Sequence, residues 1–188
     1  MERIYLNVSP EEYSEAKAAG AAWDDVSKSW YIEKNGSPVL FTRWLSEESD
    51  TAQFGIVADE VMVVEAQIPC VQCQEDVEVI CIYGESGVDT ETGGLIEQFT
   101  VSNIWAVDAE LEKQLERWPT FRRVIDGDSE GGVFANHCPH CDAAQDDYLL
   151  HSEPGDVFFG ISSTRPGLLR FTRLAACAQL SGDYGFEV

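Results

Sequence analysis

Two short cysteine pairs place the strongest constraint on what this chain can fold into. CVQC occupies residues 70–73 and CPHC occupies residues 138–141, so both pairs have the Cys-x-x-Cys spacing. Such a pair forms a tight turn whose sulfurs converge on one ion, and two pairs can supply the four thiolates of a closed, tetrahedral zinc site. We therefore predict a structural Zn²⁺ site. Its expected ligands are Cys70, Cys73, Cys138 and Cys141.

The two pairs lie far apart in the chain. Residues 74–137 separate them, which is longer than the spacing of a compact zinc ribbon. The intervening segment must therefore form an insertion that returns the chain to the first pair. Because a closed four-cysteine site leaves no open coordination position, it would hold the fold together rather than catalyse a reaction.

A redox function is the alternative interpretation of the second pair. CPHC is also the active-site tetrapeptide of periplasmic thiol oxidants of the thioredoxin fold, which the pair resembles. That chemistry requires a lowered thiol pKa, whereas Asp142, Asp146 and Asp147 would raise the pKa of a nearby thiol. A thioredoxin-type pair also needs no second pair elsewhere in the chain. The metal site is therefore favoured over the redox site.

The remaining cysteines and histidines are expected to be structural. Cys81 and Cys177 lie in apolar surroundings, which predicts buried thiols, and positions beside the metal or on the surface are expected for the histidines. One acidic and histidine-containing group can in principle build a hydrolytic or second metal site, although a solvated loop is the commoner outcome. The three histidines are His137, His140 and His151. The acidic and histidine-containing group consists of Asp146, Asp147, His151 and Glu153.

The chain is strongly acidic, and its charge is unevenly distributed. The net charge is −22, from 34 acidic and 12 basic side chains, and no Lys or Arg occurs from Ser46 to Glu112. A field of this sign repels phosphate backbones and attracts basic surfaces. The charge therefore disfavours direct nucleic-acid binding by the central region. It favours either a solvated surface that promotes solubility or a surface that binds a basic protein partner.

The first 45 residues contain the clearest secondary-structure signals. Residues 3–8 alternate apolar and polar side chains, as a half-buried strand does. Ser9 and Pro10 mark the start of a helix, Gly20 marks its end, and residues 29–32 predict a returning strand. The side chains expected in the core of this segment are Tyr13, Ala16, Ala19, Trp23, Trp30 and Trp44.

The order of aromatic and small residues in this segment is distinctive. The residues concerned are Tyr5, Leu6, Asn7, Val8, Glu15, Ala16, Lys17, Gly20, Ala21, Trp23, Asp24, Lys28, Trp30, Tyr31, Trp44 and Leu45. The segment resembles a small domain of unknown function found in plasmid primases of the TraC type and in other mobile-element proteins. Ser9 replaces the usual proline of that family, and Ala22 replaces a frequent arginine, which weakens an implied contact with nucleic acid.

The second half loosely resembles uncharacterised bacterial zinc-knuckle proteins. Asp142 and Asp146 stand where that family is expected to have glycine. The positions that fit are Gln145, Asp147, His151, Glu153, Pro154, Gly155 and Phe158.

The remaining pattern predicts an α+β chain. Residues 61–69, 76–84 and 95–107 have the composition of strands, and Asp108 is expected to cap a helix that follows. We predict an antiparallel-sheet domain stapled by the zinc-ribbon-like site, after a small strand-helix-strand module. The expected parts are the module at 1–45, an acidic linker at 46–60 and the zinc-knuckle domain at 61–188.

No catalytic motif is evident, so whether the chain is an enzyme stays open and a non-enzymatic role is favoured. We expect a zinc-binding interaction protein of a mobile genetic element whose acidic surface binds a basic, nucleic-acid-handling complex, as an inhibitor of host defence of the anti-CRISPR or DNA-mimic type does. One alternative is an accessory DNA-replication or transfer domain that contacts nucleic acid through the N-terminal module and Arg43. A zinc-dependent hydrolase or redox protein is the other.

The sequence also predicts a cytoplasmic location without a membrane partner. It has no apolar run long enough for a transmembrane helix. The first residues lack the basic and apolar segments of a secretion signal. In a reducing cytoplasm, six cysteines favour metal binding or burial over disulfides.

Overall fold

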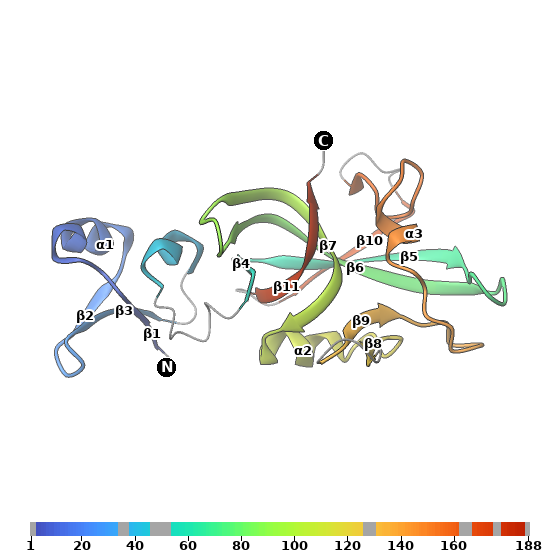
Figure 1. Cartoon of the computed structure of the whole chain (residues 1–188), viewed down its shortest axis with the longest axis horizontal. Coiled ribbons are helices and arrows are strands. Elements are labelled where there is room, and N and C mark those ends of the chain that lie inside the picture. Colours follow the sequence, from blue (N-terminus) through green and yellow to red (C-terminus); the bar gives the residue numbers. More distant parts are fainter. Residues whose placement is uncertain are drawn as a thin grey trace.

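The computed structural model of the chain describes residues 3–33, 38–45, 54–125, 131–161, 167–174 and 178–186. It is mostly β, with few and short helices, and the pairings among its described strands are antiparallel (Figure 1). The predicted α+β class with antiparallel sheets is therefore confirmed, and the sheets predominate. No helix in the described part of the chain is long and apolar enough to span a lipid bilayer.

The N-terminal part is a three-stranded sheet with a helix on one face. Its elements are β1 (Arg3–Leu6), a 3-10 helix (Pro10–Glu12), α1 (Tyr13–Ala19), β2 (Ala22–Asp24), β3 (Ser29–Glu33) and a second 3-10 helix (Pro38–Trp44). The strand order is β1-β3-β2. Gly20 ends α1 with φ of 110°, and its N–H bonds back to the carbonyls of the last turn.

The burial of this part differs from the prediction at three positions. Ala16, Trp30 and Trp44 are buried as expected, whereas Tyr13, Ala19 and Trp23 are exposed. α1 has only seven residues, so one small side chain is enough to fill its contact with the sheet. Trp23 lies on the edge strand β2, where it packs against Tyr13 and Trp30 and stays 39% exposed.

The second part contains a larger sheet and a hairpin. Its elements are β4 (Ile56–Ala58), β5 (Val61–Pro69), β6 (Asp76–Asp89), β7 (Leu95–Val107), α2 (Ala109–Leu115), β8 (Phe121–Val124), β9 (Val133–Asn136), α3 (Tyr148–His151), β10 (Arg170–Arg173) and β11 (Ala178–Phe186). Asp108 caps α2 as predicted, because its carboxylate accepts hydrogen bonds from the N–H groups of Glu110 and Leu111.

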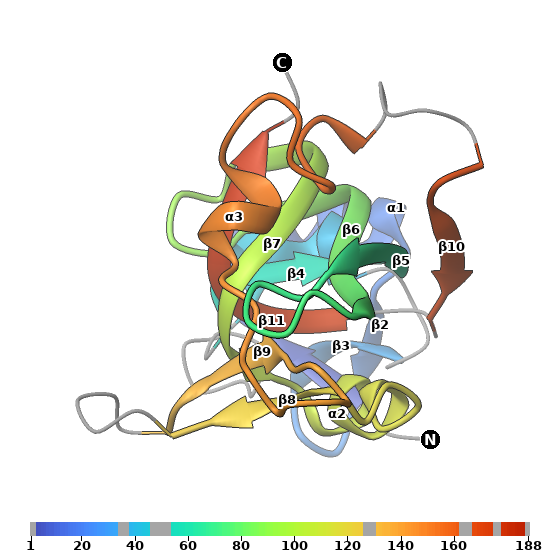
Figure 2. The same cartoon turned by 90° about the vertical axis from the view of Figure 1, so that its right-hand side faces the viewer.

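The larger sheet closes on itself as a small barrel. β6 pairs with β4 and β5 on one side and with β7 on the other, and β11 pairs with both β4 and β7 (Figure 2). The circuit β4–β6–β7–β11 is therefore complete. Phe99 is fully buried inside it, and a Cβ at Gly84 would lie 2.3 Å from the Phe99 ring. Glycine at this position is what lets the ring enter the barrel.

The barrel changes the interpretation of the segment predicted as an acidic linker at 46–60. Residues 46–53 lie outside the described residues, but β4, at Ile56–Ala58, is a fully buried strand of the barrel. That part of the segment is therefore core and not linker. Its apolar side chains complete the barrel interior. The sequence did not predict this strand, because acidic residues lie on both sides of it.

Candidate metal centre

The four cysteines of the two pairs meet at one end of the larger sheet. Their sulfur atoms all lie within 4.8 Å of one another. The sulfur of Cys70 is 3.7 Å from that of Cys141, and the sulfur of Cys73 is 3.6 Å from that of Cys138. Because the short distances join one pair to the other, the quartet is a single cluster and not two separate dithiols.

The sulfur spacing fits a tetrahedral zinc ion. With Zn–S bonds of about 2.3 Å, neighbouring sulfurs of a tetrahedron lie about 3.8 Å apart. The Cys70–Cys141 and Cys73–Cys138 sulfur distances are close to this value, and all four sulfurs lie within 4.8 Å of one another. Cys70 and Cys138 are buried, while Cys73 and Cys141 are half-buried, so the cluster lies at the margin of the core. Four convergent thiols without a disulfide are the donor set that Zn²⁺ prefers in structural sites.

The two turns that carry the cysteines have the same local structure. The first cysteine of each pair accepts at its sulfur an N–H bond from the residue two positions later, at 3.4 Å in both turns. Its carbonyl accepts from the residue four positions later, which is Gln74 in one turn and Asp142 in the other. Both of those residues have φ of 63°. Equal turns present their sulfurs in the same way, which makes the two pairs equivalent halves of one site.

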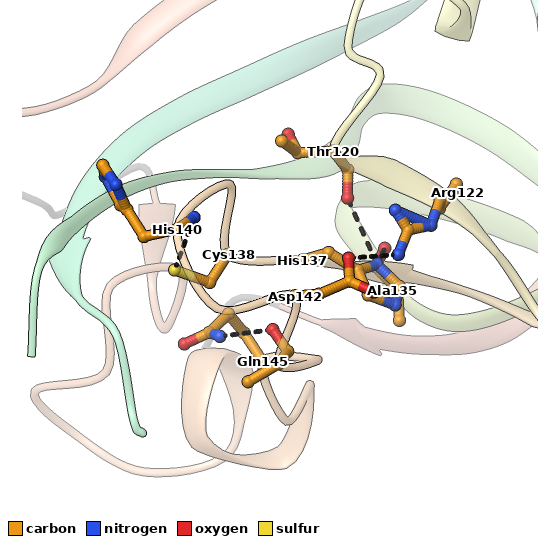
Figure 3. Close-up of polar contacts among 9 residues, drawn as sticks. Thr120, Arg122, Ala135, His137, Cys138, His140, Asp142 and Gln145 are labelled. Atoms are coloured by element: carbon orange, nitrogen blue, oxygen red, sulfur yellow. Dashed lines mark hydrogen bonds and ion pairs between the residues drawn. The ribbon is translucent and has the colours of Figure 1, made fainter. Parts of the chain in front are cut away.

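The left-handed residues explain one departure noted in the sequence. Asp142 stands where zinc-knuckle proteins of the similar pattern are expected to have glycine. Its φ of 63° lies in the region that glycine adopts at no steric cost, and aspartate is among the residues that tolerate it. The Asp142 carboxylate also pairs with Arg122, at 2.6 Å, which links the turn to β8 (Figure 3).

The β8–β9 hairpin returns the chain to the first pair. Asn136, at the end of β9, is almost fully buried, and its side-chain amide both accepts from the N–H and donates to the carbonyl of Ile80 in β6. Cys138 follows two residues later. The residues between the two pairs therefore form the returning insertion that the long separation required, and Asn136 sets its register against β6.

Gln145 joins the two turns. Its side chain is 2% exposed, its amide oxygen accepts from the N–H of Val71 at 3.1 Å, and its amide nitrogen lies 3.5 Å from the sulfur of Cys70. The same nitrogen donates to the carbonyl of Ala143 (Figure 3). A residue of the second turn thus supports the first turn. Sequence reasoning gave Gln145 no such role, because only the fold brings it to residues 70–71.

The thiol pKa values diverge within the cluster. The backbone N–H groups of Cys73 and Gln72 lower the pKa of Cys70 to about 6. For Cys73, the N–H of Glu75 lowers the pKa, but desolvation and the neighbouring sulfurs outweigh it and raise the pKa to about 12. One thiolate therefore forms readily, and the neighbouring sulfurs raise the pKa of Cys73 and Cys141. A divalent cation would relieve this repulsion, because a coordinating thiol is deprotonated.

The histidines near the second pair lie outside the cluster. His137 is buried, and its Nδ1 lies 2.9 Å from the carbonyl of Ala135 (Figure 3). Since a carbonyl only accepts, Nδ1 carries the proton and His137 is a structural donor. The exposed His140 contributes its backbone N–H to the sulfur of Cys138. These positions agree with the roles beside the site that the sequence predicted.

The side chains of the acidic and histidine-containing group, Asp146, Asp147, His151 and Glu153, do not converge on one point. Among the residues that the structure describes, the four cysteines are the sole group of three or more ligating side chains whose atoms meet. The Asp147 carboxylate accepts a hydrogen bond from the backbone N–H of Asn103, and the Asp146 carboxylate accepts one from the backbone N–H of Tyr148. Both carboxylates are therefore bonded to the backbone. His151 packs against Phe158, and burial lowers its pKa to about 4. The hydrolytic site considered for these residues is therefore not formed.

Of the two cysteines outside the pairs, Cys81 lies among the described residues and Cys177 does not. Cys81 is 2% exposed and lies in β6 with Val77, Val79 and Tyr83 in one core cluster, as the alternation predicted. The fold and the site thus define a mostly β chain in which two equivalent turns bring four thiols together.

The chain is similar in sequence to known DNA primases. Residues 3–46 match the family described as a domain of unknown function (DUF5710). The chain is 32% identical over 117 residues to one DNA primase TraC of Escherichia coli, and 30% identical over 121 residues to another. Each similarity covers 62% of this chain. Because the alignments are longer than residues 3–46, the similarity extends beyond the family match.

The chain corresponds to a small portion of these relatives. It covers 11% of the length of one primase and 8% of the other. No solved structure matches the chain. The family match and the similarity to the two primases confirm the resemblance that the N-terminal residues indicated.

Proposed function

We propose that this chain is a zinc-stapled accessory module of plasmid DNA replication or transfer that contacts nucleic acid through its N-terminal part. The observation that carries the proposal is the joint presence of a four-thiol cluster and a similarity to DNA primase TraC across most of the chain. In this role the chain would position a nucleic acid for another protein and would need no catalytic group of its own.

The zinc part of the proposal rests on the cluster geometry. Cys70, Cys73, Cys138 and Cys141 would hold Zn²⁺ with no open position, so the ion would supply cohesion between the first turn and the insertion. Binding of structural zinc is worth roughly 10–16 kcal/mol, which is comparable to the whole stability of a domain. The second part of the chain is therefore expected to fold only with the metal.

Elemental analysis of protein purified without chelator tests this part. We expect one zinc per chain, and loss of metal with loss of soluble protein in Cys70→Ser and in Cys138→Ser. Cys81→Ser is the matched control, because Cys81 is a buried thiol of the same sheet outside the cluster. Absence of zinc from the unmodified protein would contradict the proposal.

The nucleic-acid part rests on the charge of the N-terminal segment and on its family match. Residues 1–45 carry five basic and seven acidic side chains and are nearly balanced, whereas no Lys or Arg occurs from Ser46 to Glu112. Arg43, the residue favoured from the sequence, forms a 2.6 Å ion pair with Glu15 and lies over the ring of Trp44. Glu15 therefore already neutralises much of the Arg43 charge.

Gel-shift assays at low salt with single- and double-stranded DNA test the proposal. Binding of neither would rule it out.

A second candidate function follows from the charge alone. A net charge of −22 with no base from Ser46 to Glu112 suits a surface that binds a basic protein, as a DNA-mimicking inhibitor of a defence complex does. Binding of this kind is expected to weaken steeply with salt. Titration of the chain into a purified basic, DNA-binding complex distinguishes the two candidates, because a mimic competes with DNA for that complex and an accessory module does not.

A further inference from the structure

The N-terminal sheet carries a pair of exposed aromatic rings. Tyr13 and Trp23 are each 39% exposed, and their ring centroids lie 6.0 Å apart. Behind them Trp30 is 8% exposed, with its centroid 5.6 Å from Tyr13 and 5.7 Å from Trp23. Because one buried ring supports both exposed rings, the pair is held in place before any ligand arrives. Ordering it on binding then costs little entropy.

Two lysines lie beside these rings. Trp23 Nε1 donates to Asp25 Oδ1 at 3.2 Å, and Lys28 Nζ lies 3.4 Å from the same oxygen, so the indole and the ammonium group share one carboxylate acceptor. Lys17 follows Tyr13 by one turn of α1 and shares its side of the helix. Asp25 offsets part of this charge. The rings therefore have two lysines beside them, in the part of the chain where acidic and basic side chains are most nearly balanced.

We propose that Tyr13 and Trp23 form a stacking platform for the bases of a single-stranded nucleic acid, with Lys17 and Lys28 contacting its phosphates. This inference rests on the proposed function and names the surface that performs it. Aromatic rings accept any base on their faces, and lysines follow the backbone, which together give binding with little dependence on sequence. A duplex keeps its bases stacked inside, so the platform selects single strands.

Fluorescence anisotropy of the full chain with a labelled oligo-dT strand at low salt tests the platform. Loss of one stacking ring costs about tenfold in Kd, so Trp23→Ala and Tyr13→Ala are each expected to weaken binding by about that factor. Trp23→Phe keeps a ring and is expected to retain most of the affinity. Trp105→Ala is the matched control, because Trp105 is a 49% exposed tryptophan on β7, away from the patch.

A second probe separates stacking from charge. An abasic strand of the same length keeps every phosphate, so binding to it is expected to be weak in the unmodified protein and unchanged by Trp23→Ala. Lys17→Ala and Lys28→Ala are each expected to reduce the slope of log K against log salt by about 0.7. Circular dichroism and thermal unfolding of each variant establish that the fold is retained.

The possible failures can be told apart. If the unmodified chain binds oligo-dT and both alanine variants bind equally well, the platform is wrong and the proposed function stands. Equal binding of abasic and oligo-dT strands would likewise overturn the platform. If the unmodified chain binds neither single- nor double-stranded DNA at low salt, the proposed function and the platform both fail.

Discussion

At the scale of single residues, Gln145 does more for the four-cysteine cluster than its place in the sequence indicates. Its buried amide contacts the backbone of Val71 and the sulfur of Cys70, so it orients the first turn from the second. Residues that orient metal ligands typically contribute 10- to 100-fold to metal affinity. Gln145→Ala is therefore expected to weaken zinc binding by about tenfold or more.

Competition with a chromophoric chelator measures this effect. Gln72→Ala is the control, because Gln72 lies in the first turn with an exposed side chain and contributes only its backbone N–H. Equal zinc affinity in the two variants would show that the Gln145 contacts are dispensable.

Glu65 is the second residue whose environment leads to a measurable prediction. It is 5% exposed in β5 and accepts hydrogen bonds from Trp118, Arg170 and Thr172. Burial alone would raise the pKa of its carboxyl, but these donors outweigh burial and the pKa lies below its ordinary value. A depressed pKa means that the contribution of Glu65 to stability is present above the unfolded pKa. It is lost as the pH falls through the folded pKa.

Glu65→Gln is accordingly expected to lower the free energy of unfolding by about 1–3 kcal/mol at neutral pH, and by less in acid. Urea unfolding of the metal-loaded chain, from neutral pH down to the lowest pH at which zinc is retained, measures the difference. Glu78→Gln is the matched control, because Glu78 contacts the same Arg170 from an exposed position. A deficit for Glu65→Gln that stays constant across this range would contradict the assignment.

At the scale of elements, closure of the barrel depends on the contact between β6 and β7. A Cβ at Gly84 would lie 2.3 Å from Phe99 Cζ, which is far inside van der Waals contact. Overpacking of this kind typically costs 1–3 kcal/mol. Gly84→Ala is therefore expected to lower the free energy of unfolding by about 2 kcal/mol.

The same substitution at Gly55 provides the comparison, since a Cβ there would meet its nearest neighbour at an ordinary 3.8 Å. Chemical denaturation of both variants measures the effect. Phe99→Leu in the Gly84→Ala background is expected to recover part of the loss, because the two positions share one contact. Strict additivity of the two changes would count against the steric explanation.

At the scale of the whole molecule, the net charge of −22 makes self-repulsion a global term. Salt screens this repulsion, so the Tm of the metal-loaded chain is expected to rise by several degrees between low salt and about 0.5 M NaCl. Binding of an oligo-dT strand is expected to weaken over the same range. Differential scanning calorimetry at a series of salt concentrations measures the first effect, and a Tm that falls with salt would show that local ion pairs outweigh the net charge.

Much of the local structure could be predicted from the sequence. The cap at Asp108, the helix end at Gly20 and the face of β6 that carries Cys81 each depend on residues within a few positions of one another. The equal cysteine turns are local for the same reason. Short-range interactions depend on secondary-structure propensity, on hydrogen bonding to nearby backbone and on the alternation of apolar and polar residues. All three can be read from the local sequence.

What only the tertiary structure decided involves residues far apart in the chain. The insertion returns to the first pair because Asn136 bonds to Ile80, and the four sulfurs then meet across it. Trp23 is exposed because β2 is an edge strand, and Ile56–Ala58 is buried because it closes the barrel. The physical reason is common to all of these: burial and convergence depend on which distant elements pack together. The sequence by itself determined the donors and the turns that carry them, and the fold determined where they meet.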